Sequence, residues 1–229
     1  MNLANEFGLY VIEDNAQAIG SKYTFSEGRV KSTGTIGHIG TTSFFPSKNL
    51  GCYGDGGAMF TNDDNIAKNL KMIANHGQEI KYHHKVTGCN SRLDSIQAAI
   101  LNIKLNFLDS YTSNRKIMAN KYNIAFNEID EIKTPKVILN SDHVYHQYTI
   151  RVLNGRRDDL KGYLNDLGIP SMIYYPIPIH KQKPYFSGQS LSNTDVLSNQ
   201  AISLPIHTEL ENANQEYIID KLIKYFKWK

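Results

Sequence analysis

The sequence has few cysteines and no long hydrophobic run, and each absence excludes a class of protein. Its 229 residues include two cysteines, Cys52 and Cys89, too few and too far apart for a disulfide framework or a zinc site and typical of a reducing compartment. No apolar stretch reaches the roughly 18 residues that a membrane-spanning helix needs. The first residues, "MNLANEFGLYVIEDNAQ", lack the basic start and apolar centre of a signal peptide. We therefore expect a cytoplasmic protein with no membrane contact.

The chain also has little excess of charge of either sign. The formal net charge is +3, and the basic residues are scattered rather than clustered. Proteins that bind nucleic acid carry basic patches or runs, so we expect no nucleic-acid partner. A hydrophobic content of 41% is ordinary for a globular protein, and the length allows one or two domains.

Three short apolar stretches in the first part of the chain predict strands. They are "LYVI" (residues 9–12), "TTSFF" (41–45) and "GGAMFTND" (56–63), where β-branched and aromatic residues end at polar or glycine-rich turns. Apolar residues at helical spacing predict a helix over 63–77, with an aspartate cap before it and Gly77 after it.

The next residues predict a loop followed by helix. The stretch "KYHHKVTGCNSRLDSIQ" (81–97) is polar. From Ser95 to about Phe126 apolar residues recur every three or four positions, which predicts one long helix or two helices with a break near Asp109.

After about Pro135 the pattern changes to a second set of elements. It predicts strands and helices in this order: a strand over 143–152, a helix over 156–168, an extended proline-rich stretch over 169–180, a strand over 202–206 and a helix over 214–226. Alternating strands and helices indicate an α/β fold. We expect part of a large domain over residues 1–105, and a connecting helix with a small α+β domain over 106–229.

One lysine has an unusual sequence setting. Lys48 follows the strand at 41–45 in "FFPSKNLGCYGDGG" and precedes four glycines. An exposed lysine has a pKa near 10.4 and is a poor nucleophile at neutral pH, so covalent lysine chemistry needs partial desolvation. A loop at the carboxyl end of a buried strand, backed by Phe44 and Phe45, can supply it, and such strand ends are where α/β sheets bind ligands. A random lysine in a loop is far more often only structural.

Three further residues bear on whether Lys48 has a chemical role. Asp14 ends the first strand, where a carboxylate can hold a heterocyclic nitrogen protonated, as pyridoxal phosphate requires; an ordinary helix cap is the alternative. Gln17 can present its amide to a ring, and Ser43 can offer a hydroxyl to a phosphate. Each residue alone is weak evidence.

Together these segments resemble a known family. "VIEDNAQAIGSKY", "GTIGHIGTTSFFPSKNLGCYGDGGAMFTND" and "NHGQEIKYHHKVTGCNSRLDSIQAAIL" look like the DegT/DnrJ/StrS-type sugar aminotransferases, and the resemblance continues through "LGIPSMIYYPIPIHKQKPYF" to the end. It implies the C-terminal portion of a pyridoxal-phosphate (PLP)-dependent transferase of fold type I, with a partial mixed sheet of the large domain and a small C-terminal α+β domain.

The resemblance also implies site residues. Lys48 matches the lysine that forms the Schiff base with PLP, Asp14 the carboxylate on the pyridine nitrogen, Gln17 a position beside the cofactor and Ser43 the hydroxyl on its phosphate. Asn90 matches an asparagine that reaches the cofactor phosphate of a neighbouring subunit, which implies a homodimer with a shared active site.

Two further positions match less specific features of the family. His180, in "YPIPIHKQ", falls in a segment that borders the sugar-nucleotide site. Arg92 is as well explained by a structural ion pair as by a substrate contact.

The implied reaction is transamination of a nucleotide-linked keto-deoxysugar, with glutamate as the amino donor. The segment around His180 looks most like family members that act on dTDP-linked 3-keto-6-deoxyhexoses, with carbon 3 or carbon 4 as the aminated position. Such enzymes serve amino-sugar or cell-surface polysaccharide biosynthesis.

Family members are longer at the N-terminus, where they carry a phosphate-binding Gly/Ser/Thr turn. We therefore expect a sheet with an unpaired edge and exposed apolar faces, and an isolated chain that binds PLP weakly and is poorly active.

Three alternatives stand beside this interpretation. A non-catalytic, binding or regulatory relative is compatible with the shorter chain. A dehydratase of the same family is disfavoured because such members replace the lysine with histidine, whereas Lys48 is present. A metal site built from His76, His83 and His84 is disfavoured because no carboxylate or cysteine stands at ligand spacing.

Overall fold

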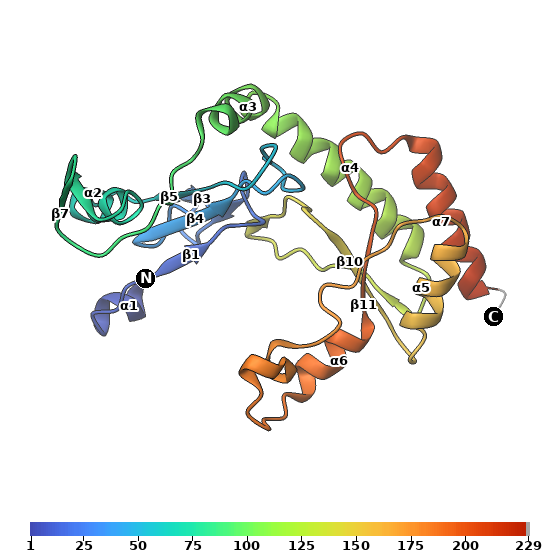
Figure 1. Cartoon of the computed structure of the whole chain (residues 1–229). Helices are drawn as coiled ribbons and strands as arrows, with labels where there is room; N and C mark the ends of the chain where they lie inside the picture. The colour runs from blue at the N-terminus through green and yellow to red at the C-terminus, as the bar shows by residue number, and fades with distance from the viewer. Residues whose placement is uncertain (228–229) are drawn as a thin grey trace. The chain divides into compact units, whose positions relative to one another are not determined.

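The computed structural model describes residues 1–227, which form two compact units. The first unit comprises Met1–Ser113 and Val137–Val144, and the second comprises Asn114–Lys136 and the residues from Tyr145 onward. In Figure 1 the first is mostly blue and green, and the second mostly yellow to red. Each unit is described by itself. None of the helices in the described part combines the length and hydrophobicity that a bilayer crossing requires.

A three-stranded sheet organises the first unit. Its strands are β1 (Ile12–Asp14), β4 (Ile39–Ser43) and β5 (Gly57–Phe60), in the order β1-β4-β5. β1 runs parallel to β4 and β5 runs antiparallel to it. The predicted strands are confirmed for β4 and β5. The first strand lies later than predicted, because the backbone of Val11 bonds to His38, through the Nδ1 atom and the backbone N–H, before regular pairing begins at Ile12.

Two smaller sheets in this unit were not predicted. β2 (Lys22–Thr24) pairs with β3 (Val30–Ser32) on one side and with β9 (Ser141–Asp142) on the other. β6 (Gln78–Ile80) and β7 (His83–His84) form a hairpin where the polar sequence predicted a loop. The loop prediction for 81–97 is therefore wrong for β7, whereas α3 begins at Ser95, where the spacing predicted helix.

Helix α2 of the first unit begins at a side-chain cap, whereas α1 does not. α1 (Asn2–Glu6) is short, whereas α2 (Asp64–Ile73) begins at Asp63, whose Oδ1 atom accepts hydrogen bonds from the backbone N–H groups of Asn65 and Ile66 at 2.8 and 2.9 Å. Gly77 follows α2 with a φ of 74° and donates its N–H to the carbonyl oxygen of Met72. The predicted helix and its aspartate cap are confirmed.

The segment from Ser95 to Phe126 forms two helices. They are α3 (Ser95–Leu105) and α4 (Leu108–Phe126), so the break lies at 106–107, slightly before Asp109. Asn106 ends α3 and turns its side-chain amide back onto the carbonyl oxygen of Asn102 at 2.9 Å. A small core of Phe44, Leu50, Cys52, Leu101 and Leu108 joins these helices to the loop after β4.

The second unit packs helices on an antiparallel sheet. The sheet order is β11-β10-β8, with β8 (Ile132–Lys133), β10 (Tyr148–Val152) and β11 (Ala201–Leu204). Its core contains residues of the sheet, of α4, of α5 (Arg157–Asp166) and of α7 (Asn212–Lys227). The remaining elements are η1 (Ile179–Lys181), η2 (Lys183–Tyr185) and α6 (Ser192–Gln200).

A buried arginine explains why β10 is shorter than predicted. Arg115 Nη1 donates to the carbonyl oxygens of Tyr145 and His146 at 3.2 Å and of Ile206 at 3.0 Å. The carbonyl groups of residues 145 and 146 therefore bond to a side chain, and the strand begins at Tyr148. Burial lowers the pKa of Arg115 from its usual value.

Candidate functional site

Two predicted site residues lie at the same edge of the sheet. Asp14 is the last residue of β1 and Ser43 the last residue of β4. Because these strands are parallel, their carboxyl ends meet at one edge, where α/β sheets bind ligands. Asp14 is exposed, and its Oδ1 atom accepts a hydrogen bond from the backbone N–H of Ala16 at 3.0 Å. Ser43 Oγ accepts from the N–H of Phe45 at 3.3 Å.

Lys48 lies in the loop that leaves this edge. Its backbone N–H donates to the carbonyl oxygen of Phe45 at 2.9 Å, which closes a turn directly after β4. The Lys48 side chain is half-buried, and among residues 1–227 its ammonium group makes no hydrogen bond or ion pair. Phe44 is buried, but Phe45 is half exposed, so Phe45 gives less desolvation than the sequence predicted.

Tight backbone packing fixes the shape of this loop. A Cβ atom on Gly51 would lie 2.4 Å from the carbonyl oxygen of Pro46, and one on Gly57 would lie 2.8 Å from that of Thr42. No side chain larger than hydrogen fits there. At these two positions the glycines allow the chain's own backbone to approach closely.

Helix α3 holds the loop through side chains that sequence reasoning missed. Lys104 Nζ donates to the carbonyl oxygen of Gly51 at 2.7 Å. Gln97 Oε1 accepts from the N–H of Tyr53 at 2.7 Å. In the sequence both residues stand next to apolar positions of a predicted helix. Their position does not identify the backbone groups to which they bond.

The residues beside Asp14 anchor the opposite face of the strand. The Glu13 carboxylate accepts hydrogen bonds from the N–H groups of Gly34, Ile36 and Gly37 at 2.8, 2.6 and 2.5 Å. The buried Asn15 side chain accepts from Thr33 Oγ1 at 2.7 Å. These contacts fix β1 on both sides of Asp14. Gln17 lies in the turn that follows, is exposed, and makes no side-chain hydrogen bond within the described chain.

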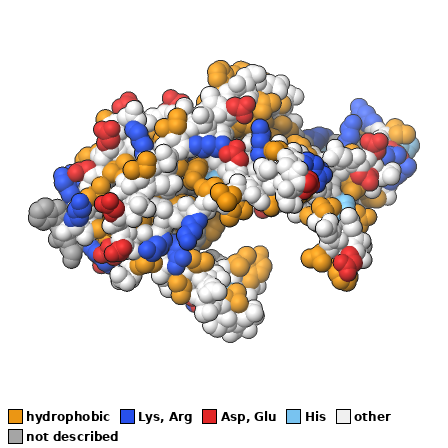
Figure 2. Space-filling model, turned by 180° about the vertical axis from the view of Figure 1, so that it is seen from behind, with side chains coloured by type: hydrophobic (Ala, Val, Ile, Leu, Met, Phe, Trp, Pro, Cys, Tyr) orange, Lys and Arg blue, Asp and Glu red, His pale blue; other side chains and the backbone are white. Residues whose placement is uncertain are grey.

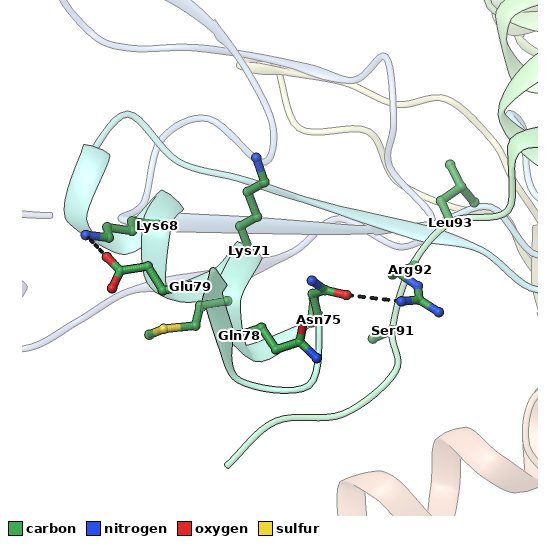
Figure 3. Close-up of a pocket in the computed structure, with 10 residues that line it drawn as sticks. Lys68, Lys71, Asn75, Gln78, Glu79, Ser91, Arg92 and Leu93 are labelled. Carbon is green, nitrogen blue, oxygen red and sulfur yellow. Dashed lines mark hydrogen bonds and ion pairs between the residues drawn. The ribbon is translucent and has the colours of Figure 1, made fainter. Parts of the chain in front are cut away.

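Asn90 lies on a separate segment of the same unit. It is exposed and forms an isolated antiparallel bridge with Asn75. Nearby, Arg92 Nη1 donates to Asn75 Oδ1 at 3.1 Å, so the structure gives Arg92 a structural partner. Arg92 and Asn75 line a cavity of about 640 Å³ shown in Figure 3, together with Lys68, Lys71, Gln78 and Glu79.

His180 lies in the second unit and is 7% exposed. Its Nε2 atom lies 3.4 Å from Asp195 Oδ1, and Lys181 Nζ lies 2.7 Å from the same oxygen. These contacts join η1 to α6. A neighbouring cavity of about 580 Å³ is lined by residues 174–179, Gln182, Tyr185 and one side of α6. The ring of His180 therefore contacts its own unit. The tyrosine side chains that line the neighbouring cavity are more exposed than this ring.

One histidine of the β6–β7 hairpin contacts the backbone of its own unit. His84 Nδ1 lies 2.8 Å from the carbonyl oxygen of His76. Within residues 1–227 no group of three histidine, cysteine, aspartate or glutamate side chains is arranged to hold a metal ion.

Curated relatives match nearly the whole chain. A "Pleiotropic regulatory protein" from Geobacillus stearothermophilus is 43% identical over 232 residues, which cover 98% of this chain and 60% of the relative. A "UDP-2-acetamido-2-deoxy-3-oxo-D-glucuronate aminotransferase" from Pseudomonas aeruginosa is 41% identical, covering 94% and 58%. A "dTDP-3-amino-3,4,6-trideoxy-alpha-D-glucose transaminase" from Streptomyces venezuelae is 38% identical, covering 95% and 57%. The chain thus spans about 60% of the length of these relatives.

Solved structures give the same result for the fold. The crystal structure of S. venezuelae DesV in complex with a ketimine intermediate has a TM-score of 0.91 and 37% identity, covering 99% of this chain and 60% of that one. The structure of NtdA from Bacillus subtilis, described with bound cofactor PMP, has a TM-score of 0.85 and 28% identity, covering 99% and 52%. The fold is that of the PLP-dependent aminotransferases, as the sequence predicted.

A family model covers almost all of the chain. It is described as the "DegT/DnrJ/EryC1/StrS aminotransferase family" and matches residues 1–223. The segments that carried the resemblance in the sequence lie on β1, on β4 and the loop after it, and on the residues leading into α3. This chain belongs to the DegT/DnrJ/EryC1/StrS aminotransferase family.

Proposed function

We propose that this chain supplies the lysine-bearing part of a PLP-dependent sugar-nucleotide aminotransferase. The observation that carries the proposal is the shared edge of β1 and β4, where Asp14, Ser43 and the Lys48 loop meet. A primary amine can bond to an aldehyde, a carboxylate can hold a proton on a ring nitrogen, and a hydroxyl can donate a hydrogen bond to a phosphate. The residues present therefore fit three parts of PLP.

Each residue has a proposed role. Lys48 would hold the cofactor through its amine; once the amine of the donor has displaced it, the freed Nζ atom would take and return the proton at the donor's α-carbon. Asp14 holds a proton on the ring nitrogen, and Gln17 lies beside it in the following turn. Ser43 donates to the phosphate. When bound, PLP supplies the electron sink that this proton transfer needs.

The half-buried position of Lys48 supports its role. Partial burial restricts the positions that the side chain can take near the end of β4. The absence of an ion-pair partner in the described chain leaves the amine free to react. Asn90, exposed on its own segment, is proposed to reach the cofactor phosphate of a second copy in a homodimer.

We propose a nucleotide-linked keto-sugar as the amino acceptor and glutamate as the donor. The names of two relatives place an oxo or an amino group at carbon 3 of the sugar, one on UDP and one on dTDP. This supports carbon 3 over carbon 4, and our first choice is a dTDP-3-keto-6-deoxyhexose. We place His180 and the tyrosine-lined cavity beside it at the border of the sugar-nucleotide site.

A hybrid protein tests this function. The part of the G. stearothermophilus relative that lies outside its match is joined to this chain, and 2-oxoglutarate formed from glutamate is measured after loading with PLP. Lys48→Ala should lower the rate by a factor of about 10² or more, because the proton-transferring group is lost. Lys71→Ala, at an exposed lysine of the same unit, should leave it unchanged. Equal rates for the two variants would contradict the role of Lys48.

A non-catalytic relative is the second candidate. It is favoured by the name of the G. stearothermophilus relative. A folded hybrid that binds no PLP would support this candidate over the enzyme.

A further inference from the structure

Two neighbouring carboxylates of β1 lie on opposite faces of the sheet. Side chains alternate along a strand, so those of Glu13 and Asp14 point away from each other. In the parallel pairing with β4, Glu13 stands beside Gly40 and Asp14 beside Thr41. One face of β1 therefore carries the Asp14 carboxylate, and the other face carries that of Glu13.

The residues between β3 and β4, 33–37, bind the Glu13 carboxylate with three backbone groups. Glu13 Oε1 accepts from the N–H of Gly34, and Oε2 accepts from those of Ile36 and Gly37. These bonds are 2.8, 2.6 and 2.5 Å long, and hydrogen bonds to an ionised carboxylate are stronger than those between neutral groups. The Glu13 side chain thus fastens the 33–37 loop to β1.

Glycines let this loop lie directly on the sheet. A Cβ atom on Gly40 would lie 1.9 Å from the carbonyl oxygen of Gly34, and one on Gly37 would lie 2.9 Å from that of Val11. Gly34 and Gly40 are buried, and Gly34 has a φ of 82°, which side chains disfavour. Contacts made by the chain itself therefore cover this face of β1 and β4.

The same loop also fixes the residue after Asp14. Thr33 Oγ1 donates to Asn15 Oδ1 at 2.7 Å, and Asn15 is only 3% exposed. The backbone N–H of Asn15 donates to the carbonyl oxygen of Thr41 at 2.8 Å, and its own carbonyl oxygen accepts from Thr42 Oγ1 at 3.2 Å. Asp14 thus stands between two anchored residues, and its carboxylate moves mainly by rotation about its own side-chain bonds.

We propose that Glu13 is a positioning residue for the reaction: it fastens β1 to the 33–37 loop and so holds the Asp14 carboxylate where it keeps a ring nitrogen protonated. A group that acts on a bound ring must be held to within about 0.5 Å by the residues around it. Glu13 acts through Asp14, because its own oxygens face the other side of β1 and are bonded to the loop. This inference rests on the role proposed for Asp14.

The experiment uses the full chain, reduced with borohydride in the presence of PLP so that the pyridoxyl group is fixed covalently. The NMR shift of an isotope-labelled ring nitrogen then reports its protonation as the pH is varied. Asp14→Asn should lower the proton affinity of this nitrogen about tenfold or more, because the facing charge is lost. Glu13→Gln turns an N–H donor toward N–H groups of the loop, which releases Asp14, and should lower the affinity at least about threefold.

Glu27 provides a control with the same change of charge. It is exposed and pairs with Arg29 at 2.9 Å, and Figure 2 shows acidic side chains close to basic ones on several parts of the visible face. Glu27→Gln should leave the ring nitrogen unchanged. Glu13→Asp keeps the charge but is too short to reach all three N–H groups, so it should act in the same direction as Glu13→Gln. Circular dichroism verifies that each variant is folded.

Hydrogen exchange of the chain without PLP gives a readout that does not depend on the cofactor. The Asn15 amide should exchange at least about tenfold faster in Glu13→Gln and at the original rate in Glu27→Gln. An unchanged Asn15 amide in Glu13→Gln would overturn the proposal.

The two readouts also separate this proposal from the proposed function. A ring nitrogen that responds to Asp14→Asn but to neither Glu13 variant would overturn the positioning role and leave the role of Asp14 standing. A ring nitrogen that does not respond to Asp14→Asn, or a pyridoxyl group found away from Lys48, would contradict the proposed function itself.

Discussion

Lys104 Nζ donates a hydrogen bond to the carbonyl oxygen of Gly51 at 2.7 Å, which ties the loop that carries Lys48 to helix α3. The same ammonium lies 4.8 Å from the centre of the Tyr53 ring. The two contacts hold the loop on both sides of Cys52, whose buried thiol contacts the carbonyl oxygens of Phe44 and Gly54 at 3.0 Å. The position of Lys48 therefore depends on a residue more than fifty positions further along the chain.

Lys104→Met tests whether the hydrogen bond to Gly51 holds the loop. The variant keeps the length of the side chain but removes its donor, which leaves the Gly51 carbonyl without a charged partner, a loss of about 1.5–3 kcal/mol for such a bond. We expect faster hydrogen exchange at residues 48–52. The control is Lys121→Met in the second unit, where Lys121 Nζ donates to Asn212 Oδ1 at 2.9 Å. Unchanged exchange at 48–52 in Lys104→Met would show that α3 does not hold the loop.

Gly51→Ala tests the close packing of the same loop. The added methyl would lie 2.4 Å from the Pro46 carbonyl oxygen, so the turn must open, at a cost of about 1–3 kcal/mol. Gly162→Ala is the matched control, because no atom lies within 4 Å of its Cβ position inside α5, and it should stabilise the chain by about 0.5–1 kcal/mol. Denaturant unfolding measures both. A Gly51→Ala chain as stable as the unaltered one would contradict the packing account.

The β6–β7 hairpin should loosen in acid. Hydrogen bonds first from Lys68 and then from Lys85 lower the pKa of Glu79 from 4.5 to about 2. A carboxylate with a lowered folded-state pKa contributes stability above its unfolded pKa and loses it as pH falls. We therefore expect hydrogen exchange of residues 78–84 to accelerate between about pH 4.5 and pH 2. Lys68→Met should raise the folded-state pKa of Glu79, so that the acceleration becomes smaller and is complete at a higher pH, and an acceleration equal to that of the unaltered chain would refute the pairing.

The core of the second unit should respond strongly to truncation. Leu160 is fully buried between α5 and the β10–β11 sheet, so Leu160→Ala should destabilise the chain by about 2–5 kcal/mol. Leu139 is fully exposed, and Leu139→Ala should change the free energy of unfolding by less than about 0.5 kcal/mol. Thermal unfolding of the two variants measures the difference, and similar values would contradict the assigned core.

The sequence predicted local structure where short-range chemistry determines it. Asp63 caps α2 as expected, because a cap depends on neighbours two and three residues away. The β2–β9 pair was missed because Tyr23 and Ser141 are far apart in the chain and neither strand has a clear apolar alternation. Hairpin β6–β7 was missed because its residues are polar, and an ion-pair cluster at Glu79 holds it.

The sequence supplied the residue types of the candidate site but not the contacts that hold them in place. Asp14, Ser43 and Lys48 could be selected because each lies in or just after a predicted strand, and the structure puts all three at or beside one sheet edge. The residues that hold this edge in place, Glu13 and Lys104, bond to backbone groups distant in sequence. A single sequence contains no signal for such contacts, because backbone groups are the same at every position.

The most direct test of the central claim is to locate the lysine that binds PLP. The 229-residue chain is incubated with saturating PLP, reduced with borohydride and digested, and the pyridoxyl-lysine is identified by peptide mass spectrometry. We expect labelling concentrated on Lys48, reduced in Asp14→Asn and absent from that peptide in Lys48→Ala. Labelling spread over exposed lysines such as Lys71, with no preference for Lys48, would contradict it.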